Sequence, residues 1–354
     1  MLRPATSTMP VNGEAVQQVL LARAFKSLGY SVSMVVRAGN EPIEDVVDGI
    51  RVISAFKWGA GIPILRFFHP MASGVIRALN KADADVYYQS PAGGLTGLTA
   101  AFCRWKNRKF IFRVASDVNC IPGQQLIELW RDRKLFEYGL RRADVVAVQS
   151  HYQLELLKHH YGLESTVVNM AMEIPAEDLA SERDIDVIWV SNLRPVKRAE
   201  RMLSLARQMP KFKFVMIGGP IRGDKEYYAR IEREAADLTN VQFLGQLPYD
   251  EVNEHIARSK VFLNTSDVEG FPNTFLQAWA RRVPIVSFFD PDEVITTKGL
   301  GIRPDGEAEM LAALTKLLTN THARERIGAT AREYALANFS SVAAAKRYLS
   351  LLDA

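Results

Sequence analysis

Three polar residues stand at steps of four in the segment EGFPNTFLQAWA, residues 269–280. These are Glu269, Asn273 and Gln277, and a Gly-Phe-Pro turn follows the first of them. A strand exit at Glu269 and a helix beginning at Pro272 would place Asn273 and Gln277 on one helical face that points back towards Glu269. Free backbone N–H groups at 273–275 would attract an anion. Spacing alone favours a plain strand–loop–helix connection with a solvated polar face, so further signals are needed.

Basic residues follow a second expected strand. The segment SNLRPVKRAE, residues 191–200, carries Arg194, Lys197 and Arg198 where the next helix should begin. Cations at a helix N-terminus oppose the helix dipole, and a bound phosphate would resolve that conflict. An exposed basic turn explains the same pattern. Gly218 belongs to a glycine pair at a third strand end, where the backbone could approach a ligand or form a plain turn.

Composition limits the class of protein. The chain has 354 residues, of which 48% are hydrophobic and 24% are charged, as expected for two soluble domains with sizeable cores. Basic residues number 44 and acidic residues 40, so no global charge indicates nucleic-acid binding. Cys103 and Cys120 lack the spacing of a disulfide framework or a zinc site, which fits a reducing cytoplasm. Neither a signal peptide nor a membrane-spanning apolar run is apparent.

Short β-rich runs alternate with helical patterns almost throughout the chain. The expected strands are 31–38, 85–90, 109–115 and 144–150, and then, after the pattern restarts, 184–192, 211–219, 241–246, 260–266 and 283–289. The polar segment 172–184 is the expected linker, and 340–352 predicts a last amphipathic helix. Repeated βα units predict α/β domains with parallel sheets covered by helices, in which ligands bind beyond the carboxyl ends of the strands.

Taken in this order, the three strand-end signals resemble the family 4 retaining glycosyltransferases, and the resemblance covers nearly the whole chain. It implies a GT-B architecture of two doubly wound, Rossmann-like domains that face a cleft. The acceptor-side domain would span residues 1–175 and the nucleotide-sugar domain residues 184–338. Residues 339–354 would form a C-terminal helix that packs back on the first domain.

The second half carries most of this resemblance. Family members typically have two glutamates with seven residues between them, of which the first contacts the donor sugar and the second the ribose of the nucleotide. Glu269 holds the first position and Gln277 the second. Lys197 matches the lysine that grips the donor diphosphate, while Asn192 replaces the usual arginine and Arg194 is its candidate substitute. The implied donor-binding residues are Gly13, Arg194, Lys197, Gly218, Leu247, Glu269, Gly270, Phe271, Pro272, Asn273, Thr274 and Gln277.

The first half departs from the family pattern in three places. Residues 12–30 resemble the glycine-rich loop and first helix of the family, with Gly13 in place and Asn12 instead of a second glycine. Many members have a histidine where this chain has Ser116 and Asp117, and which of the two faces the donor sugar stays open. Asp117 joins Lys197 and Glu269 as the third candidate catalytic residue. Residues 1–10 offer only a stub of an opening strand, so we expect the sequence to begin downstream of its natural start.

The resemblance implies transfer of a sugar from UDP- or GDP-sugar, with retention of configuration, to a glycan, lipid-linked or small-molecule acceptor. A hexosyltransferase of bacterial polysaccharide or glycoconjugate synthesis is the expected kind of enzyme. Lys197, Arg194 and the helix start at 273–275 would stabilise the charge of the leaving diphosphate. We therefore expect no cofactor and no metal, and the Asp-x-Asp at 83–85 precedes its strand rather than following it.

Two alternatives belong to other functional classes. The segment AGGLTG at 92–97, followed by Asp117, imitates a dinucleotide-binding fingerprint and suggests an NAD-dependent oxidoreductase, although Ala92 stands where the first glycine belongs. The second alternative is a non-catalytic nucleotide-sugar-binding GT-B protein. Gln277, Asn192 and the missing histidine would mark such a loss of activity.

Basic segments of the first domain bear on the acceptor. Residues 102–113 and 131–142 are rich in arginine and lysine and contain aromatic residues, so they predict a cationic, amphipathic surface or, more plainly, solvated faces. Such a surface would attract anionic lipid and bring a cytoplasmic enzyme to the inner face of the membrane, close to a lipid-linked acceptor. Nucleic acid is not an expected partner.

Overall fold

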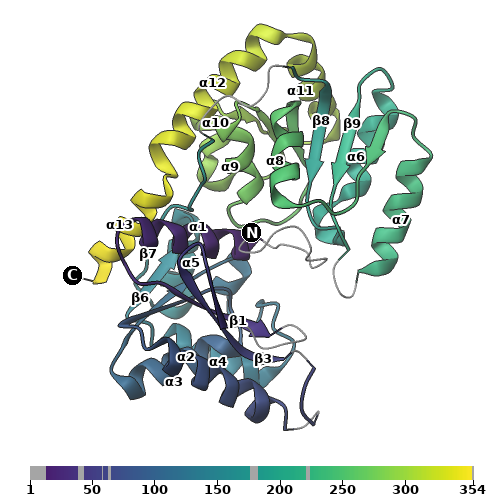
Figure 1. Ribbon diagram of the computed structural model, residues 1–354. Helices are drawn as coiled ribbons and strands as arrows, with labels where there is room; N and C mark the ends of the chain where they lie inside the picture. Colours follow the sequence, from purple (N-terminus) through teal and green to yellow (C-terminus); the bar gives the residue numbers. More distant parts are fainter. Residues whose placement is uncertain are drawn as a thin grey trace. The chain divides into compact units, whose positions relative to one another are not determined.

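The computed structural model describes residues 13–38, 44–57, 59–62, 65–175, 182–220 and 224–352. The chain forms two compact units (Figure 1). Unit 1 comprises residues 172–340 together with the short segment that ends at Ala15, and unit 2 comprises Val16–Ala171 and Ser341–Ala354. The start of the chain, with Asn12, and residues 176–181 of the expected linker lie outside the described residues.

Unit 1 contains a six-stranded parallel sheet. Its strands are β8 (Ile185–Val190), β9 (Phe214–Ile217), β10 (Val241–Phe243), β11 (Ser259–Asn264), β12 (Ile285–Ser287) and β13 (Gly301–Ile302). Their spatial order is β10-β9-β8-β11-β12-β13. The chain therefore builds outward from β8 in one direction, returns beside β8 as β11, and continues in the other direction. Such a reversal opens a crevice at the carboxyl ends of the two central strands.

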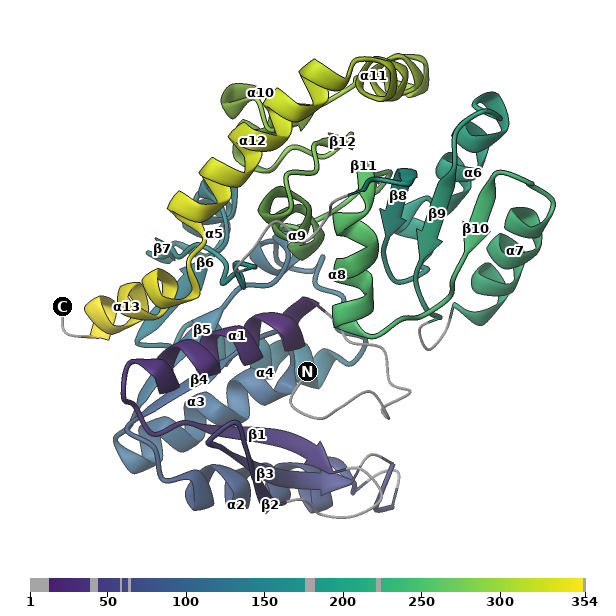
Figure 2. The ribbon, with the colours of Figure 1, turned by 45° about the horizontal axis from the view of Figure 1, so that its top comes forward.

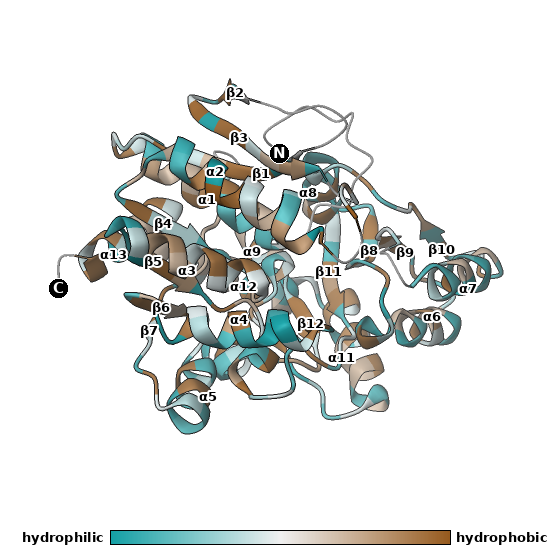
Figure 3. Cartoon of the chain, turned by 90° about the horizontal axis from the view of Figure 1, so that it is seen from below, coloured by the Kyte–Doolittle hydropathy of each residue, from teal (hydrophilic) through white to brown (hydrophobic). Residues whose placement is uncertain are grey.

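Helices cover both faces of this sheet. They are α6 (Ala199–Gln208), α7 (Lys225–Ala236), α8 (Tyr249–Ala257), α9 (Asn273–Ala280), α10 (Val294–Lys298), α11 (Glu307–Thr319) and α12 (Thr321–Asn338), with 3-10 turns η3 (Pro195–Lys197) and η4 (Pro291–Glu293). Alternate side chains of the central strands, such as Trp189 and Leu263, join α6, α7 and α11 in one core. On the opposite face Phe262 packs edge-on against Phe275 of α9, and Figure 2 shows α8 running beside β11. In Figure 3, α6 and α7 carry both polar and apolar residues, as expected for helices with one buried face.

Unit 2 contains two sheets. The strands β4 (Val86–Gln89), β5 (Lys109–Arg113), β6 (Val145–Val148) and β7 (Thr166–Val167) form a parallel sheet in that order. In the other sheet β3 (Ile50–Lys57) pairs in parallel with β1 (Ser33–Ala38) and antiparallel with β2 (Glu44–Val47). The β2–β3 hairpin was not among the predicted strands. Its turn residues Asp48 and Gly49 both have positive φ, 53° and 72°, which is the geometry that an Asp-Gly pair favours.

The helices of unit 2 sandwich the four-stranded sheet. They are α1 (Gly13–Ser27), α2 (Ser73–Ala82), α3 (Gly94–Lys106), α4 (Trp130–Leu140), α5 (His151–Tyr161) and α13 (Ser341–Leu352), with short turns η1 (Phe67–Ala72) and η2 (Asp117–Cys120). Ile111 faces the core formed with α1 and α13, and its neighbours Phe110 and Phe112 face α3 and α4. A buried hydrogen bond of 2.9 Å from Arg113 to the Tyr348 hydroxyl ties α13 to β5.

The glycines of AGGLTG have a packing role. A Cβ on Gly94 would lie 2.9 Å from Asp132 Oδ1 of α4, and a Cβ on Gly97 would overlap the carbonyl oxygen of Leu135. Gly139 of α4 is equally close to Thr96 of α3, because its Cβ would lie 2.5 Å from the Thr96 carbonyl oxygen. These glycines therefore let two helices approach each other closely, and this packing explains the segment without a bound dinucleotide.

The predicted strands are confirmed. Each of the nine expected runs contains a strand, from β1 in 31–38 to β12 in 283–289, and the last expected helix is α13. Among the described residues, no helix is both long enough and apolar enough to cross a membrane.

Candidate active site

A lysine–glutamate pair lies at the carboxyl ends of the two central strands of unit 1. Lys197 ends the η3 turn that follows β8, and Glu269 lies in the loop that follows β11. Lys197 Nζ donates to Glu269 Oε2 at 2.6 Å, and the two side chains are only 17% and 12% exposed. The pair sits where the chain reverses its direction across the sheet, which is where open α/β sheets bind ligands. The structure thus brings together two of the three residues predicted to be catalytic.

Neighbouring polar residues fix this pair. Asn264, the last residue of β11, donates from Nδ2 to Glu269 Oε1 at 3.3 Å and accepts from the backbone N–H of Ser266 at 3.0 Å. Thr265 donates to the carbonyl oxygen of Lys197 at 2.8 Å and accepts from the indole N–H of Trp189 at 2.9 Å. Hydrogen bonds that involve both side chains and backbone groups therefore hold the loops after β8 and β11 together. The sequence analysis missed Asn264 and Thr265, although both lie at the end of a predicted strand.

Carboxylates pair with the basic residues of the turn after β8. Arg198 caps α6 and pairs with Asp267 at 2.5 Å, and Arg201 pairs with the other oxygen of the same carboxylate at 2.6 Å. Burial raises the pKa of Asp267, but the hydrogen bonds from Arg198 and Arg201 outweigh it and leave the pKa below its usual value. Two acids of the β11 loop, Asp267 and Glu269, thus oppose the cations of the β8 loop. For Arg198 no bound phosphate is needed to relieve the conflict with the helix dipole, because the carboxylate of Asp267 already pairs with it.

The start of α9 differs in detail from its prediction. Pro272 is the N-cap rather than the first helical residue, and the backbone N–H of Phe275 already donates to the Pro272 carbonyl at 3.1 Å. Only the turn before Phe275 remains as a candidate anion site, with Asn273 and Thr274 half-buried. Phe271 is buried against Trp279 and Phe339, with ring centroids 6.1 and 5.3 Å apart. Phe271 therefore anchors the loop through its side chain, and Gly270 precedes it in that loop.

Gln277 is buried, with only 8% of its surface exposed. The expected solvated polar face of α9 is therefore absent, because residues 275–280 are all buried. The hydroxyl of Tyr249, the first residue of α8, forms hydrogen bonds with the side chains of Asn253 and Gln277. Burial raises the pKa of Tyr249, whereas these hydrogen bonds lower it. The side chain of Arg281 donates to the Gln277 carbonyl at 3.1 Å. Gln277 thus belongs to a polar cluster that joins α8 to α9, a contact that spacing could not reveal.

Other predicted donor-binding residues lie on neighbouring strand ends. Gly218 follows β9, and a Cβ there would overlap the Ser191 carbonyl oxygen, so the neighbouring backbone alone requires glycine. Leu247 is half-buried in the loop before α8, and Arg194 is exposed at the start of η3. Gly13 groups with unit 1, where a Cβ on it would collide with the side-chain amide of Asn273.

Asp117 belongs to unit 2, at the carboxyl end of β5. Its Oδ1 accepts from Gln153 Nε2 at 2.8 Å. Gln153 is fully buried, and its Oε1 accepts from the backbone N–H of Gln149 at 2.9 Å, which fixes the amide with its NH2 group towards Asp117. Ser116 is half-buried and directly precedes the turn that begins at Asp117. Gln153, which the sequence analysis missed, orients the carboxylate.

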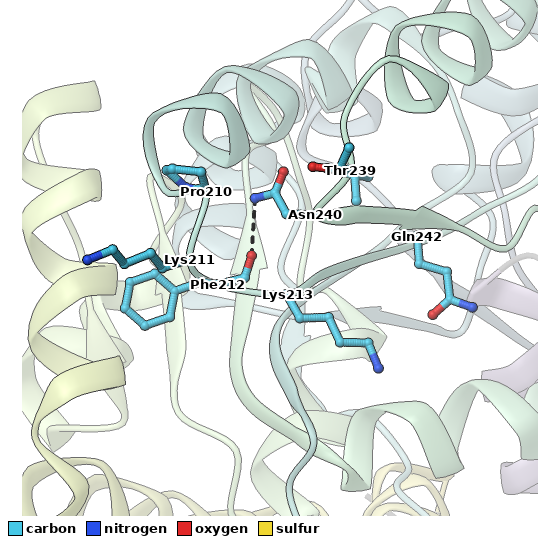
Figure 4. Close-up of a pocket in the computed structure, with 8 residues that line it drawn as sticks. Pro210, Lys211, Phe212, Lys213, Thr239, Asn240 and Gln242 are labelled. Atoms are coloured by element: carbon cyan, nitrogen blue, oxygen red, sulfur yellow. Dashed lines mark hydrogen bonds between the residues drawn. The ribbon is translucent and has the colours of Figure 1, made fainter.

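Two hollows open on unit 1. One of about 340 Å³ lies at the carboxyl ends of β11 and β12 and includes Arg201 and Asp267. The other, of about 400 Å³, lies at the opposite edge of the sheet, beside the amino ends of β9 and β10 (Figure 4). There the Asn240 side chain donates to the carbonyl oxygen of Phe212 at 3.1 Å and so holds a turn together. The first hollow includes Asp267, which pairs with Arg198 in the loop after β8. The second lies at the opposite ends of the strands from the predicted site residues.

An open parallel sheet, covered by helices and with its strand order reversed between β8 and β11, defines a Rossmann-like unit. Family models agree with this class. The model described as glycosyl transferases group 1 matches residues 171–334, and the model described as glycosyltransferase family 4 matches residues 11–170. The two matches together cover nearly the whole chain, and the protein belongs to this glycosyltransferase family. No curated protein sequence matches it.

Solved structures confirm the GT-B fold with its two Rossmann-like domains. The sucrose-phosphate synthase of Thermosynechococcus elongatus aligns with a TM-score of 0.77 at 18% identity, covering 98% of this chain and 95% of that one. Anabaena HepE in complex with UDP and glucose aligns with a TM-score of 0.78 at 15% identity, covering 99% and 98%. The trehalose-6-phosphate synthase OtsA gives 0.75 at 15% identity, covering 99% and 97%. At these identities the similarity concerns the fold alone.

Proposed function

We propose that the protein transfers a sugar from a nucleotide sugar to a glycan, lipid-linked or small-molecule acceptor, with retention of configuration. The donor is a UDP-sugar or a GDP-sugar, and we favour the UDP-sugar. The observation that carries this proposal is the Lys197–Glu269 pair at the switch point of unit 1. A diphosphate placed beyond β8 and β11 would meet the Lys197 ammonium first. HepE was solved with UDP and glucose, which makes UDP the first nucleotide to test.

Charge stabilisation is the proposed chemistry. As the bond between sugar and diphosphate breaks, negative charge grows on the leaving group, and Lys197 with Arg194 and the start of α9 would stabilise it. Glu269 would contact the donor sugar, and it would keep the Lys197 side chain in place until the diphosphate binds. Asp117, which belongs to unit 2, stays the third proposed catalytic residue. In this scheme no metal and no covalent intermediate on a side chain are needed.

A cytoplasmic location, in polysaccharide or glycoconjugate synthesis, is part of the proposal. Both cysteines of the chain, Cys103 and Cys120, are buried and free, which agrees with a reducing compartment. Mainly because of burial, the pKa of each thiol is raised to about 12, so neither cysteine is a reactive nucleophile.

The proposal is tested by incubating the purified protein with UDP- and GDP-sugars and following released nucleotide by chromatography. We expect release of UDP or GDP with at least one donor, faster in the presence of a sugar acceptor, and a product whose anomeric proton coupling in NMR matches that of the donor. Nucleotide binding by calorimetry without any release would instead support a non-catalytic binding protein. An inverted product would contradict the retaining reaction but leave the donor site intact.

A further inference from the structure

Six large apolar side chains of unit 2 are more than half exposed in two segments. The first segment contributes Ile62, Leu65 and Phe68, and the second, which leads into α4, contributes Leu126, Leu129 and Trp130. We call these six residues the apolar patch. Single exposed apolar side chains are common on protein surfaces, whereas a group of this size marks a surface that contacts something else.

A direct contact joins the two segments. The guanidinium group of Arg131, the residue after Trp130, lies 3.6 Å from the centroid of the Phe67 ring. Phe67 is buried and packs edge-on against the exposed Phe68, with ring centroids 5.4 Å apart. The segments are therefore neighbours on one surface, near the helices α2, α3 and α4 that lie together in Figure 1.

The surroundings of the patch are strongly basic. Residues 57–82 contain four lysines and arginines and no acid, and residues 121–142 contain five against three acids. Two of these acids are already paired, Asp132 with Arg131 at 2.9 Å and Glu137 with Lys134 at 3.0 Å. The whole chain has an excess of only four basic residues, so outside these two stretches acids outnumber bases. Together the two stretches that hold the apolar patch have nine basic residues against three acids, so these segments carry a net positive charge.

This charge limits what can cover the patch. In a symmetric dimer the patch would face its own copy, and the positively charged segments of one protomer, with Arg66 beside the apolar side chains, would meet the same segments of the other. An anionic bilayer instead offers negative headgroups for the arginines and acyl chains for the tryptophan, phenylalanine, leucine and isoleucine side chains. We propose that the apolar patch docks unit 2 onto an anionic lipid bilayer.

The location of this surface differs from the sequence-based expectation. The basic segment 102–113 is not one surface, because β5 buries Phe110, Phe112 and Arg113 inside unit 2. Its exposed part, at the end of α3, presents Trp105 with Lys106 stacked on the indole ring at 4.2 Å. Trp105 is 69% exposed and Trp130 is 76% exposed, but only Trp130 belongs to the apolar patch. The two tryptophans are therefore a matched pair for a test.

The test is co-sedimentation with vesicles of phosphatidylglycerol and phosphatidylcholine in equal parts, compared with pure phosphatidylcholine. It needs no donor or acceptor, so its outcome is independent of the proposed reaction. We expect the protein to sediment with the anionic vesicles only, and to be released at roughly 0.5 M NaCl. Trp130→Ser and the loop variant Leu126→Ser should each weaken binding by about tenfold, and Trp105→Ser by less than about twofold.

Unchanged circular dichroism would establish that the variants fold. The proposal is overturned if the parent ignores anionic vesicles, or if Trp105→Ser and Trp130→Ser weaken binding equally. It is also overturned if light scattering shows a dimer of the parent that Leu126→Ser dissociates, since a second copy would then occupy the patch.

Discussion

Replacing Lys197 by methionine should separate nucleotide binding from stability. The methionine keeps most of the side-chain length but cannot donate to a diphosphate. A hydrogen bond to a charged group contributes about 1.5–3 kcal/mol, so we expect UDP affinity to fall by about 10- to 100-fold. The loss also leaves Glu269, at 12% exposure, with the 3.3 Å bond from Asn264 as its remaining described partner. Because the pair is neither fully buried nor exposed, the free energy of unfolding should fall by about 1–3 kcal/mol.

The same two strands provide a matched control. Lys260 of β11 pairs with Asp186 of β8 at 2.7 Å, with exposures of 30% and 16%, at the amino ends of the strands. Lys260→Met should therefore cost a comparable part of the stability, measured by urea unfolding, and leave UDP binding within about twofold. Glu269→Gln should retain or tighten UDP binding, because it removes a negative charge near the diphosphate, while transfer falls steeply.

Isothermal titration calorimetry with UDP on the four proteins decides between the outcomes. Equal UDP affinities for the parent and Lys197→Met would refute the assignment of the diphosphate site. So would a Lys260→Met variant that loses as much affinity as Lys197→Met, because the effect would then follow from stability rather than from contact with the nucleotide.

Four further predictions concern other parts of the chain. Gln277→Leu should weaken UDP or GDP binding by about tenfold in calorimetry and Gln277→Glu should be tolerated, and if Gln277→Leu binds like the parent the residue serves only the polar cluster. Gln153→Leu should lower kcat by about tenfold with little change in donor KM, because Asp117 loses its orienting donor, whereas the buried control Gln125→Leu should not; equal effects would argue against it. Gly97→Ala should lower the free energy of unfolding by about 1–3 kcal/mol in a denaturant titration, since its Cβ meets a backbone carbonyl, and an unchanged midpoint would contradict the packing role. Transfer should persist in excess EDTA, and a strict need for manganese or magnesium would refute the proposed charge stabilisation.

The strands could be predicted from the pattern of hydrophobic residues along the chain, because buried parallel strands are short apolar runs between helices. The sequence placed Lys197 and Glu269 at strand ends, and the family resemblance assigned both to the donor site; the structure shows that they follow the two central strands of one sheet and form a pair. The β2–β3 hairpin was missed although Asp48 and Gly49 signal it. The described side chains of β2 are exposed or half-buried, and β3 buries only Ile50, Val52 and Ile53 in its first half, so the hairpin lacks the continuous apolar run of the other strands.

Side-chain partners were beyond the reach of the sequence. Nothing in the spacing of Gln277 indicates that Tyr249, 28 positions earlier, would approach it, because that contact depends on how α8 and α9 pack. The same applies to Asp267, which neutralises Arg198 across two loops, and to Gln153, which reaches Asp117 from the next βα connection. Tertiary packing decides which polar residues become ligands for one another and which remain for a substrate.

The chain enters unit 1 from unit 2 after Ala171 and returns to unit 2 at Ser341. During synthesis on the ribosome all of residues 172–340 therefore emerge before α13 exists. Until then the guanidinium of Arg113 lacks the hydroxyl of Tyr348, and the face of the sheet around Ile111 lacks one of its covering helices. Most of unit 2 is thus synthesised before unit 1, but unit 2 gains its last helix only after residues 172–340 have emerged, so the fold of unit 2 is completed last.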